Sequence, residues 1–159
     1  MPKLYMLVGL PCVGKTTWVE NQKFDSDVSI VSTDKQIEDY AKSIGQTYND
    51  VFPAYYNEAK KLMDAEIALA VENKQDIVWD QTNLTIASRA GKLLQIPSDY
   101  VKIAVLFKPI QEKKYNKLLK QRRGKIISQR VILMMTESYE EPKISEGFDC
   151  IQKVEEWTK

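Results

Sequence analysis

Short apolar runs alternate along the chain with longer segments in which apolar residues recur at helical spacing. The apolar runs predict strands at residues 3–8, 28–32, 76–80, 100–107 and 148–154. The segments between them predict helices at residues 15–23, from about residue 34, and at 54–73, 85–95, 110–121 and 128–139. Residues 45–53, GQTYNDVFP, are expected to form a turn.

This alternation predicts a three-layer α/β fold. Several of the expected strands are apolar throughout, which is typical of a parallel sheet covered by helices on both faces. The chain of 159 residues is long enough for one domain with a sizeable core, and we expect that domain to span residues 1–159 around a sheet of about five strands. Ligands of such sheets bind beyond the carboxyl ends of the strands, so candidate residues belong there.

Composition narrows the choice of function. The net charge of +1 gives no overall attraction to nucleic acid or membrane, so any electrostatic preference is local. The sequence has no histidine, which excludes histidine bases and histidine metal sites, and Cys12 and Cys150 are too few for a disulfide framework. No apolar run is long enough for a bilayer, and residues 1–20 lack a signal-peptide pattern, so we expect a cytoplasmic protein without a membrane partner.

A phosphate-binding loop is predicted directly after the first strand. Residues 9–16, GLPCVGKT, match G-x-x-x-x-G-K-[ST]. Backbone N–H groups of such a loop, together with the following helix, surround an anion, while Lys15 reaches the β- and γ-phosphates and Thr16 ligates Mg²⁺. We therefore expect a nucleoside triphosphate as donor. Its expected contacts are Gly9, Pro11, Cys12, Val13, Gly14, Lys15, Thr16 and Thr17.

Two carboxylates follow predicted strands. Asp34 comes just after the strand at 28–32, where it fits a base that orients an attacking hydroxyl and takes its proton, and where it equally fits a helix N-cap. Asp80 ends the next strand and is typical of an aspartate that helps to hold Mg²⁺, although D-x-T-N is also a turn sequence.

Basic residues concentrate at 108–130, where nine positive side chains accompany one acid, Glu112. Gly124 interrupts the helical pattern directly after Arg122 and Arg123. This combination predicts a lid over residues 110–130 that closes on the triphosphate and brings an arginine to the charge that develops during transfer. The alternative is a solvated helix face.

In their order along the chain, these motifs resemble the kinase domain of polynucleotide 5′-hydroxyl kinases. The matching segments are G-x-P-x-x-G-K-T-T-W, V-S-T-D, D-x-T-N-L, the arginine–glycine lid and P-x-x-x-E-G-F, and the resemblance spans residues 3 to about 154. It implies a P-loop kinase fold that uses ATP and Mg²⁺ to phosphorylate the 5′-hydroxyl ends of DNA or RNA.

The resemblance also implies roles for individual residues. Asp34 matches the general base, and Arg123, with Arg122 as second choice, matches the lid arginine on the donor phosphates. Asp80, Thr82 and Asn83 match a segment near the acceptor, and residues 146–149 match one near the donor nucleobase.

The sequence departs from this family at position 37. Many members have an arginine there that helps to hold the acceptor, whereas this chain has Ile37, so Lys35, Gln36 and Arg89 are the candidate replacements. The chain has no phosphatase or ligase motif, so complete end repair implies separate phosphatase or ligase partners. A small-molecule or nucleotide kinase of the same fold, and a nucleotide-binding module without an acceptor, remain alternatives.

Aromatic residues cluster between the second and third predicted strands, where small P-loop kinases keep their acceptor-binding helices. They are Tyr48, Phe52, Tyr55 and Tyr56. These side chains fit either stacking on nucleic-acid bases or half-buried core positions.

Overall fold

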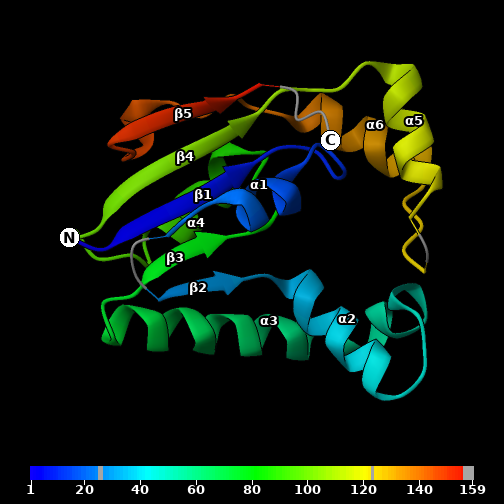
Figure 1. Cartoon of the computed structure of the whole chain (residues 1–159), viewed down its shortest axis with the longest axis horizontal. Coiled ribbons are helices and arrows are strands. Elements are labelled where there is room, and N and C mark those ends of the chain that lie inside the picture. The colour runs from blue at the N-terminus through cyan, green and yellow to red at the C-terminus, as the bar shows by residue number, and fades with distance from the viewer. Residues whose placement is uncertain (25–26, 123, 156–159) are drawn as a thin grey trace.

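A parallel sheet forms the centre of the computed structural model, which describes residues 1–24, 27–122 and 124–155 (Figure 1). Within these residues the strands are β1 (Lys3–Val8), β2 (Val28–Val31), β3 (Asp76–Trp79), β4 (Val101–Phe107) and β5 (Cys150–Val154). Their order across the sheet is β2-β3-β1-β4-β5, and each neighbouring pair is parallel. The predicted α/β fold with a five-stranded parallel sheet is confirmed.

Helices lie on both faces of this sheet because successive side chains of a strand point in opposite directions. On one face are α1 (Lys15–Asn21), α5 (Glu112–Lys120) and α6 (Gln129–Ser138), and on the other are α3 (Tyr48–Glu72) and α4 (Ile86–Leu93). Leu4 and Met6 of β1 pack towards α3 and α4, whereas Leu7 packs towards Trp18 of α1. Helix α2 (Thr33–Ser43) packs against α3, and a short 3₁₀ helix, η1 (Ile144–Glu146), precedes β5.

The predicted turn at residues 45–53 is too long. Helix α3 begins at Tyr48, because Thr47 and Asp50 form a capping box in which each side chain accepts a hydrogen bond from the other residue's backbone N–H. Pro53, which favoured a turn in the sequence, lies inside the second turn of this helix. The extension places Tyr48 and Phe52 on a helix beside α2 rather than on a loop.

In the part of the chain that the structure describes, no helix combines the length and the apolar character that crossing a bilayer requires.

Candidate active site

The loop between β1 and α1 is a tight turn suited to a phosphate group. Cys12 and Gly14 have left-handed backbones, with φ of 64° and 101°. Gly9 has no room for a side chain, since an ideal Cβ would lie 2.9 Å from Val13 Cγ2 and 3.0 Å from Phe107 Cβ. Alternation of right- and left-handed residues turns successive N–H groups into one concavity, which is the geometry that anions occupy.

Lys15 lies over this loop. Its Nζ donates hydrogen bonds to the carbonyl oxygens of Gly9 and Leu10, both at 2.8 Å. Burial lowers the pKa of Lys15 to about 8, although the charges of Asp80 and Asp34 act in the opposite direction. The ammonium therefore has weak carbonyl partners that phosphate oxygens could replace with a stronger, charge-assisted contact.

The other expected nucleotide contacts follow the same turn. Thr16 is exposed, so its hydroxyl is accessible to a metal ion. Pro11 and Thr17 are half-buried, whereas Val13 is buried in the cluster that contains Trp18. Val13 can therefore offer a nucleotide its backbone but not its side chain.

Asp34 lies in the first turn of α2 and does not cap the helix. The N-cap is Ser32, whose hydroxyl accepts a hydrogen bond from the Lys35 backbone N–H at 3.3 Å. The Asp34 carboxylate instead accepts from the Tyr48 hydroxyl at 2.7 Å on Oδ1 and from Lys125 Nζ at 2.6 Å on Oδ2. Burial alone would raise the pKa of Asp34, but Lys125 and Tyr48 outweigh it and hold this pKa below its usual value. The side chain is therefore an ionised carboxylate.

Asp80 follows β3, and its backbone N–H donates to the Val31 carbonyl at 2.9 Å. Burial raises the pKa of Asp80, with the charge of Lys15 opposing that shift and the charge of Asp34 adding to it. These electrostatic interactions join Lys15, Asp34 and Asp80 into one group at the carboxyl end of the sheet.

A magnesium ion fits this group only together with a nucleotide. Among the described residues, no cluster of three or more histidine, cysteine, aspartate or glutamate side chains could hold a metal ion. Thr16 and Asp80 would supply two oxygen ligands, and Mg²⁺ in phosphate sites usually completes its shell with phosphate oxygens and water.

Asn83, expected to contact the acceptor, has its amide group engaged inside the protein. The residue is 1% exposed, and its Nδ2 donates to the Leu7 carbonyl at 2.7 Å. Its Oδ1 accepts a hydrogen bond from Lys92 Nζ. Asn83 therefore holds the loop after β3 against β1, and the backbone carbonyl of the neighbouring Thr82 accepts a hydrogen bond from the Gly9 N–H at 3.0 Å. Both residues line a cavity.

Arg89, also expected at the acceptor, lies inside the protein. Its side chain is fully buried and forms a two-pronged ion pair with Glu146, with Nε–Oε2 at 2.8 Å and Nη2–Oε1 at 2.9 Å. Its third contact is the Asn83 carbonyl at 2.9 Å. The guanidinium is thus fully used inside the protein.

Residues 146–149, expected near the donor nucleobase, lie away from the phosphate loop. Glu146 is occupied by Arg89, and Phe148 is buried in the core cluster with Leu4. The backbone N–H of Asp149 donates to the Lys102 carbonyl at 2.8 Å, near the start of β4. The phosphate loop follows the opposite, carboxyl end of the sheet, so this segment lies at the wrong end for the donor base.

The lid region consists of α5, a connection and α6. Arg123, the first choice for the lid arginine, lies outside the described residues. Arg122 is half-buried, and its positive charge lowers the pKa values of both Lys15 and Asp34. Lys35 is exposed. Sequence reasoning counted Lys125 among the basic residues but missed its contact with Asp34, because nothing in the pattern links residues so far apart.

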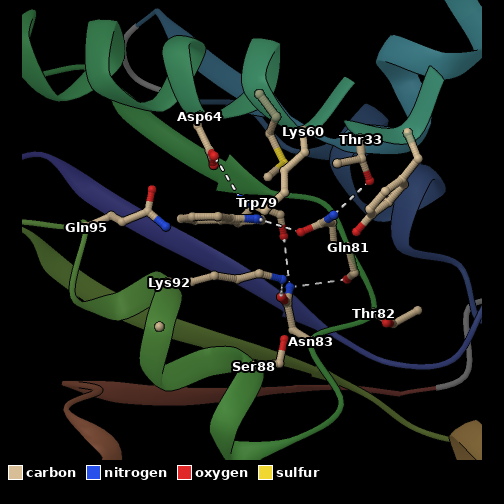
Figure 2. A pocket seen from close by; sticks show the side chains of 13 residues that line it. Thr33, Lys60, Asp64, Trp79, Gln81, Thr82, Asn83, Ser88, Lys92 and Gln95 are labelled. Carbon is tan, nitrogen blue, oxygen red and sulfur yellow. Dashed lines mark hydrogen bonds and ion pairs between the residues drawn. The ribbon is translucent and has the colours of Figure 1, made fainter. Parts of the chain in front are cut away.

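A cavity of about 470 Å³ opens between α3 and α4, beyond the end of β3 (Figure 2). Trp79 Nε1 donates to Gln81 Oε1 at 3.0 Å, and Gln81 Nε2 donates to the Thr33 hydroxyl at 2.8 Å along its wall. Lys60 and Lys92 also line it, and burial lowers the pKa of Lys92 to about 8, with the charge of Lys60 acting in the same direction. Its lining mixes polar and apolar side chains, and it lies beside the residues that neighbour Asp34 and Asp80.

The aromatic residues of α3 differ in their exposure and in their ring contacts. Tyr55 is half-buried and stacks on Tyr40 with ring centroids 3.9 Å apart. Tyr48, Phe52 and Tyr56 instead follow one another along the helix, with centroids 5.5 and 5.4 Å apart. Phe52 and Tyr56 are each 39% exposed. We call these three residues the aromatic strip; it runs from the partner of Asp34 to the wall of the cavity.

Comparison with known proteins finds a family model and several solved structures that are similar to this chain. A family model described as an AAA domain matches residues 4–142. A chain of the Pnkp1/Rnl/Hen1 RNA repair complex is 23% identical with a TM-score of 0.66, and the alignment covers 86% of the present chain and 43% of that chain.

Two other solved structures are similar to this protein, and each alignment covers most of this chain and most of the matched chain. A gluconokinase from Sinorhizobium meliloti 1021 is 14% identical to this chain, with a TM-score of 0.56. The alignment covers 99% of this chain and 85% of the gluconokinase. Kti12 from Chaetomium thermophilum, in complex with ADP-AlF3, is 16% identical with a TM-score of 0.53, at coverages of 96% of this chain and 88% of that one. These likenesses establish a shared fold, and the chain spans less than half of the repair-complex chain that it matches.

Proposed function

The chain belongs to the AAA domain family and has the fold of P-loop kinases, and from that premise we propose that it transfers the γ-phosphate of ATP to the 5′-hydroxyl end of DNA or RNA. The observation that carries the proposal is the position of Asp34. Its ionised carboxylate interacts electrostatically with Lys15 of the phosphate loop and is hydrogen-bonded to Tyr48, the first residue of the aromatic strip.

On the donor side, the loop after β1 would bind the triphosphate and Lys15 would neutralise charge on the transferred group. Thr16 and Asp80 would hold Mg²⁺, which supplies further charge neutralisation when bound. Arg122 or Arg123 would contact the phosphates from the lid. This arrangement provides cations wherever negative charge accumulates in a loose phosphoryl-transfer transition state.

On the acceptor side, Asp34 would orient the hydroxyl and receive its proton. The acceptor O–H bond breaks, its oxygen forms a bond to the γ-phosphorus, and the bond from that phosphorus to the β–γ bridging oxygen breaks to release ADP. A carboxylate with a lowered pKa is a weak base, which suits a reaction in which positioning contributes more than proton abstraction.

The exposed aromatic strip favours a nucleic-acid acceptor over a small molecule. Base–aromatic stacking is worth ~1–3 kcal/mol per base and tolerates any sequence, so exposed rings beside a catalytic carboxylate suit a single strand whose terminal hydroxyl is the substrate. In RNA or DNA repair such a kinase would act with a phosphatase or a ligase on the same ends.

The cavity between α3 and α4 favours the second candidate, a small-molecule kinase. Its volume of about 470 Å³ and its two lysines suit a nucleoside or a sugar acid. The similarity to a gluconokinase fold is compatible with that acceptor class.

The deciding experiment incubates the protein with γ-labelled ATP, Mg²⁺ and 5′-hydroxyl DNA and RNA oligonucleotides, beside a panel of nucleosides and sugars. We expect label on the oligonucleotides. Lys15→Ala and Asp34→Ala should both abolish transfer, but Asp34→Ala should still bind ATP. The matched control is Asp39→Asn, which changes an exposed carboxylate elsewhere on α2 and should transfer phosphate like wild type. Label on a nucleoside or sugar alone would establish the second candidate, and normal transfer by Asp34→Ala would refute the base assignment.

A further inference from the structure

Lys125 is a buried lysine on the connection between α5 and α6. It is 9% exposed, and its Nζ lies 2.6 Å from Asp34 Oδ2 and 3.4 Å from Glu38 Oε1. The same nitrogen lies 4.5 Å from the centroid of the Tyr48 ring, a cation–π distance. Three groups from α2 and α3 thus define the position of one ammonium beside the proposed base.

The backbone around Lys125 is fixed as well. The Asn49 side chain accepts from the Ile126 N–H at 2.8 Å and donates to the Ile126 carbonyl at 3.2 Å. The Asn49 backbone N–H donates to the Gly124 carbonyl at 3.3 Å. Because three hydrogen bonds join this connection to the start of α3, the approach of Lys125 to Asp34 does not depend on its flexible side chain alone.

The other described cations near Asp34 have different surroundings. Lys15 lies over the phosphate loop, and Arg122 lines a pocket with Lys125 and Tyr48 while also interacting electrostatically with Lys15. The hydrogen bonds to the Asp34 carboxylate itself come from Lys125 and Tyr48. Position 37 of α2 is occupied by Ile37, which is fully buried in an apolar cluster, so α2 brings no cation there. Lys125 therefore supplies positive charge at the point where an acceptor hydroxyl would approach Asp34.

We propose that Lys125 is a specificity-determining residue that binds the phosphate next to the acceptor's 5′-hydroxyl. This inference rests on the proposed function, since it takes the open side of Asp34 as the acceptor side. Both oxygens of Asp34 are already hydrogen-bonded, so an incoming hydroxyl has to share or displace one partner. An ammonium displaced from Oδ2 needs a new anion, and the nearest anion on a nucleic-acid end is its first internucleotide phosphate.

The same exchange discriminates against neutral acceptors. A nucleoside without a phosphate would take a hydrogen-bonding position of Asp34 and leave a largely buried ammonium with only Glu38 and the Tyr48 ring. Losing the closer of its two carboxylate partners is unfavourable for a buried charge, so the ion pair acts against the wrong acceptor as well as for the right one.

The test compares two acceptors that differ by one group, a nucleoside and its 3′-monophosphate, at saturating ATP. We expect the wild-type protein to prefer the 3′-monophosphate. Lys125→Met, which keeps the length of the side chain, should raise KM for the 3′-monophosphate about 10- to 100-fold, as expected for one charged hydrogen bond. It should leave KM for the nucleoside unchanged or lower, because no buried ammonium has to be displaced, and should change KM for ATP by less than about threefold. Lys125→Arg should restore the preference, and Lys153→Met, an exposed lysine on β5 at the far edge of the sheet, should match wild type.

An equal rise of KM for both acceptors in Lys125→Met would show that Lys125 only shapes the lid. A preference of Lys125→Met for the 3′-monophosphate as strong as that of wild type would also overturn the proposal. A second measurement distinguishes a failure of the Lys125 inference from a failure of the proposed kinase activity. Calorimetric binding of the nucleoside and its 3′-monophosphate, with a non-hydrolysable ATP analogue present, requires no transfer to occur. If wild type binds the 3′-monophosphate no more tightly than the nucleoside, or if Lys125→Met leaves that difference intact, Lys125 does not recognise the phosphate, whatever the acceptor assay gives.

Discussion

Removing the exposed rings of the aromatic strip should weaken binding of long acceptors and spare short ones. The double change Phe52→Leu with Tyr56→Leu keeps apolar side chains on α3 but removes the flat surfaces on which bases stack. Both residues are 39% exposed, so their outer faces are accessible, while their packed edges retain an apolar neighbour after the change. The substitution therefore tests stacking with little disturbance of the helix.

The expected size follows from the geometry of the strip. Stacking is worth ~1–3 kcal/mol per base, which corresponds to a change in affinity of about 5- to 150-fold. The two ring centroids are 5.4 Å apart, so adjacent bases can contact both rings, and the two single variants are expected to be non-additive. The double variant should thus raise KM for oligonucleotides by at least about fivefold.

The assay measures KM against acceptor length, from a nucleoside 3′-monophosphate to a six-nucleotide strand, at saturating ATP. Wild-type affinity should rise over the first few nucleotides, and the double variant should lose that rise while its KM for the mononucleotide stays within about threefold. Tyr40→Leu is the matched control, since Tyr40 is 37% exposed and stacks on Tyr55 outside the strip. Equal KM values for wild type and variant at every length, or the same loss with Tyr40→Leu, would refute the reasoning.

Three further predictions concern the donor side and stability. Because the pKa of Lys15 is lowered to about 8 and a bound phosphate would favour the charged form, ATP affinity should fall as pH rises above about 8, and calorimetry near pH 8 should detect proton uptake that Lys15→Met removes. Gly9→Ala should abolish nucleotide binding and reduce the free energy of unfolding by ~1–3 kcal/mol in urea, since its Cβ would lie 2.9 Å from Val13 Cγ2. Arg89→Met should destabilise the protein by ~3–5 kcal/mol by leaving Glu146 buried without its partner, and Glu146→Met added to it should recover part of that loss in the same urea titration.

The fold and the phosphate loop could be predicted from the sequence because each depends on patterns among neighbouring residues. Most of the strands are short, mainly apolar runs, and the loop's turn depends on neighbouring residues such as Gly9 and Gly14. The start of α3 was missed because Pro53 suggested a turn more strongly than the capping box at Thr47 suggested a helix. Helix boundaries depend on such competing local preferences.

The roles of Arg89 and Asn83 could not be found in this way. An arginine on an amphipathic helix is ordinarily solvated, and full burial requires a partner, which here is Glu146, 57 positions further along the chain. Asn83 sits in a motif that suggested substrate contact, yet its amide is used to fix the loop to the Leu7 carbonyl. Residue type and spacing identified where the polar groups lie, but only the folded arrangement shows which of them already have partners.

Position 37 links these observations to the proposed mechanism. Ile37 is fully buried in the apolar contact between α2 and α3, against which Tyr48 also packs, so position 37 provides no cation for Asp34. The cation beside Asp34 comes instead from Lys125, three residues after Arg122 on the same connection. In the proposed mechanism, a single segment would therefore carry a charge for the donor phosphates and a charge for the acceptor. If both contacts form as proposed, closure on ATP and recognition of the acceptor are one conformational step, and an acceptor that does not engage Lys125 leaves that step incomplete.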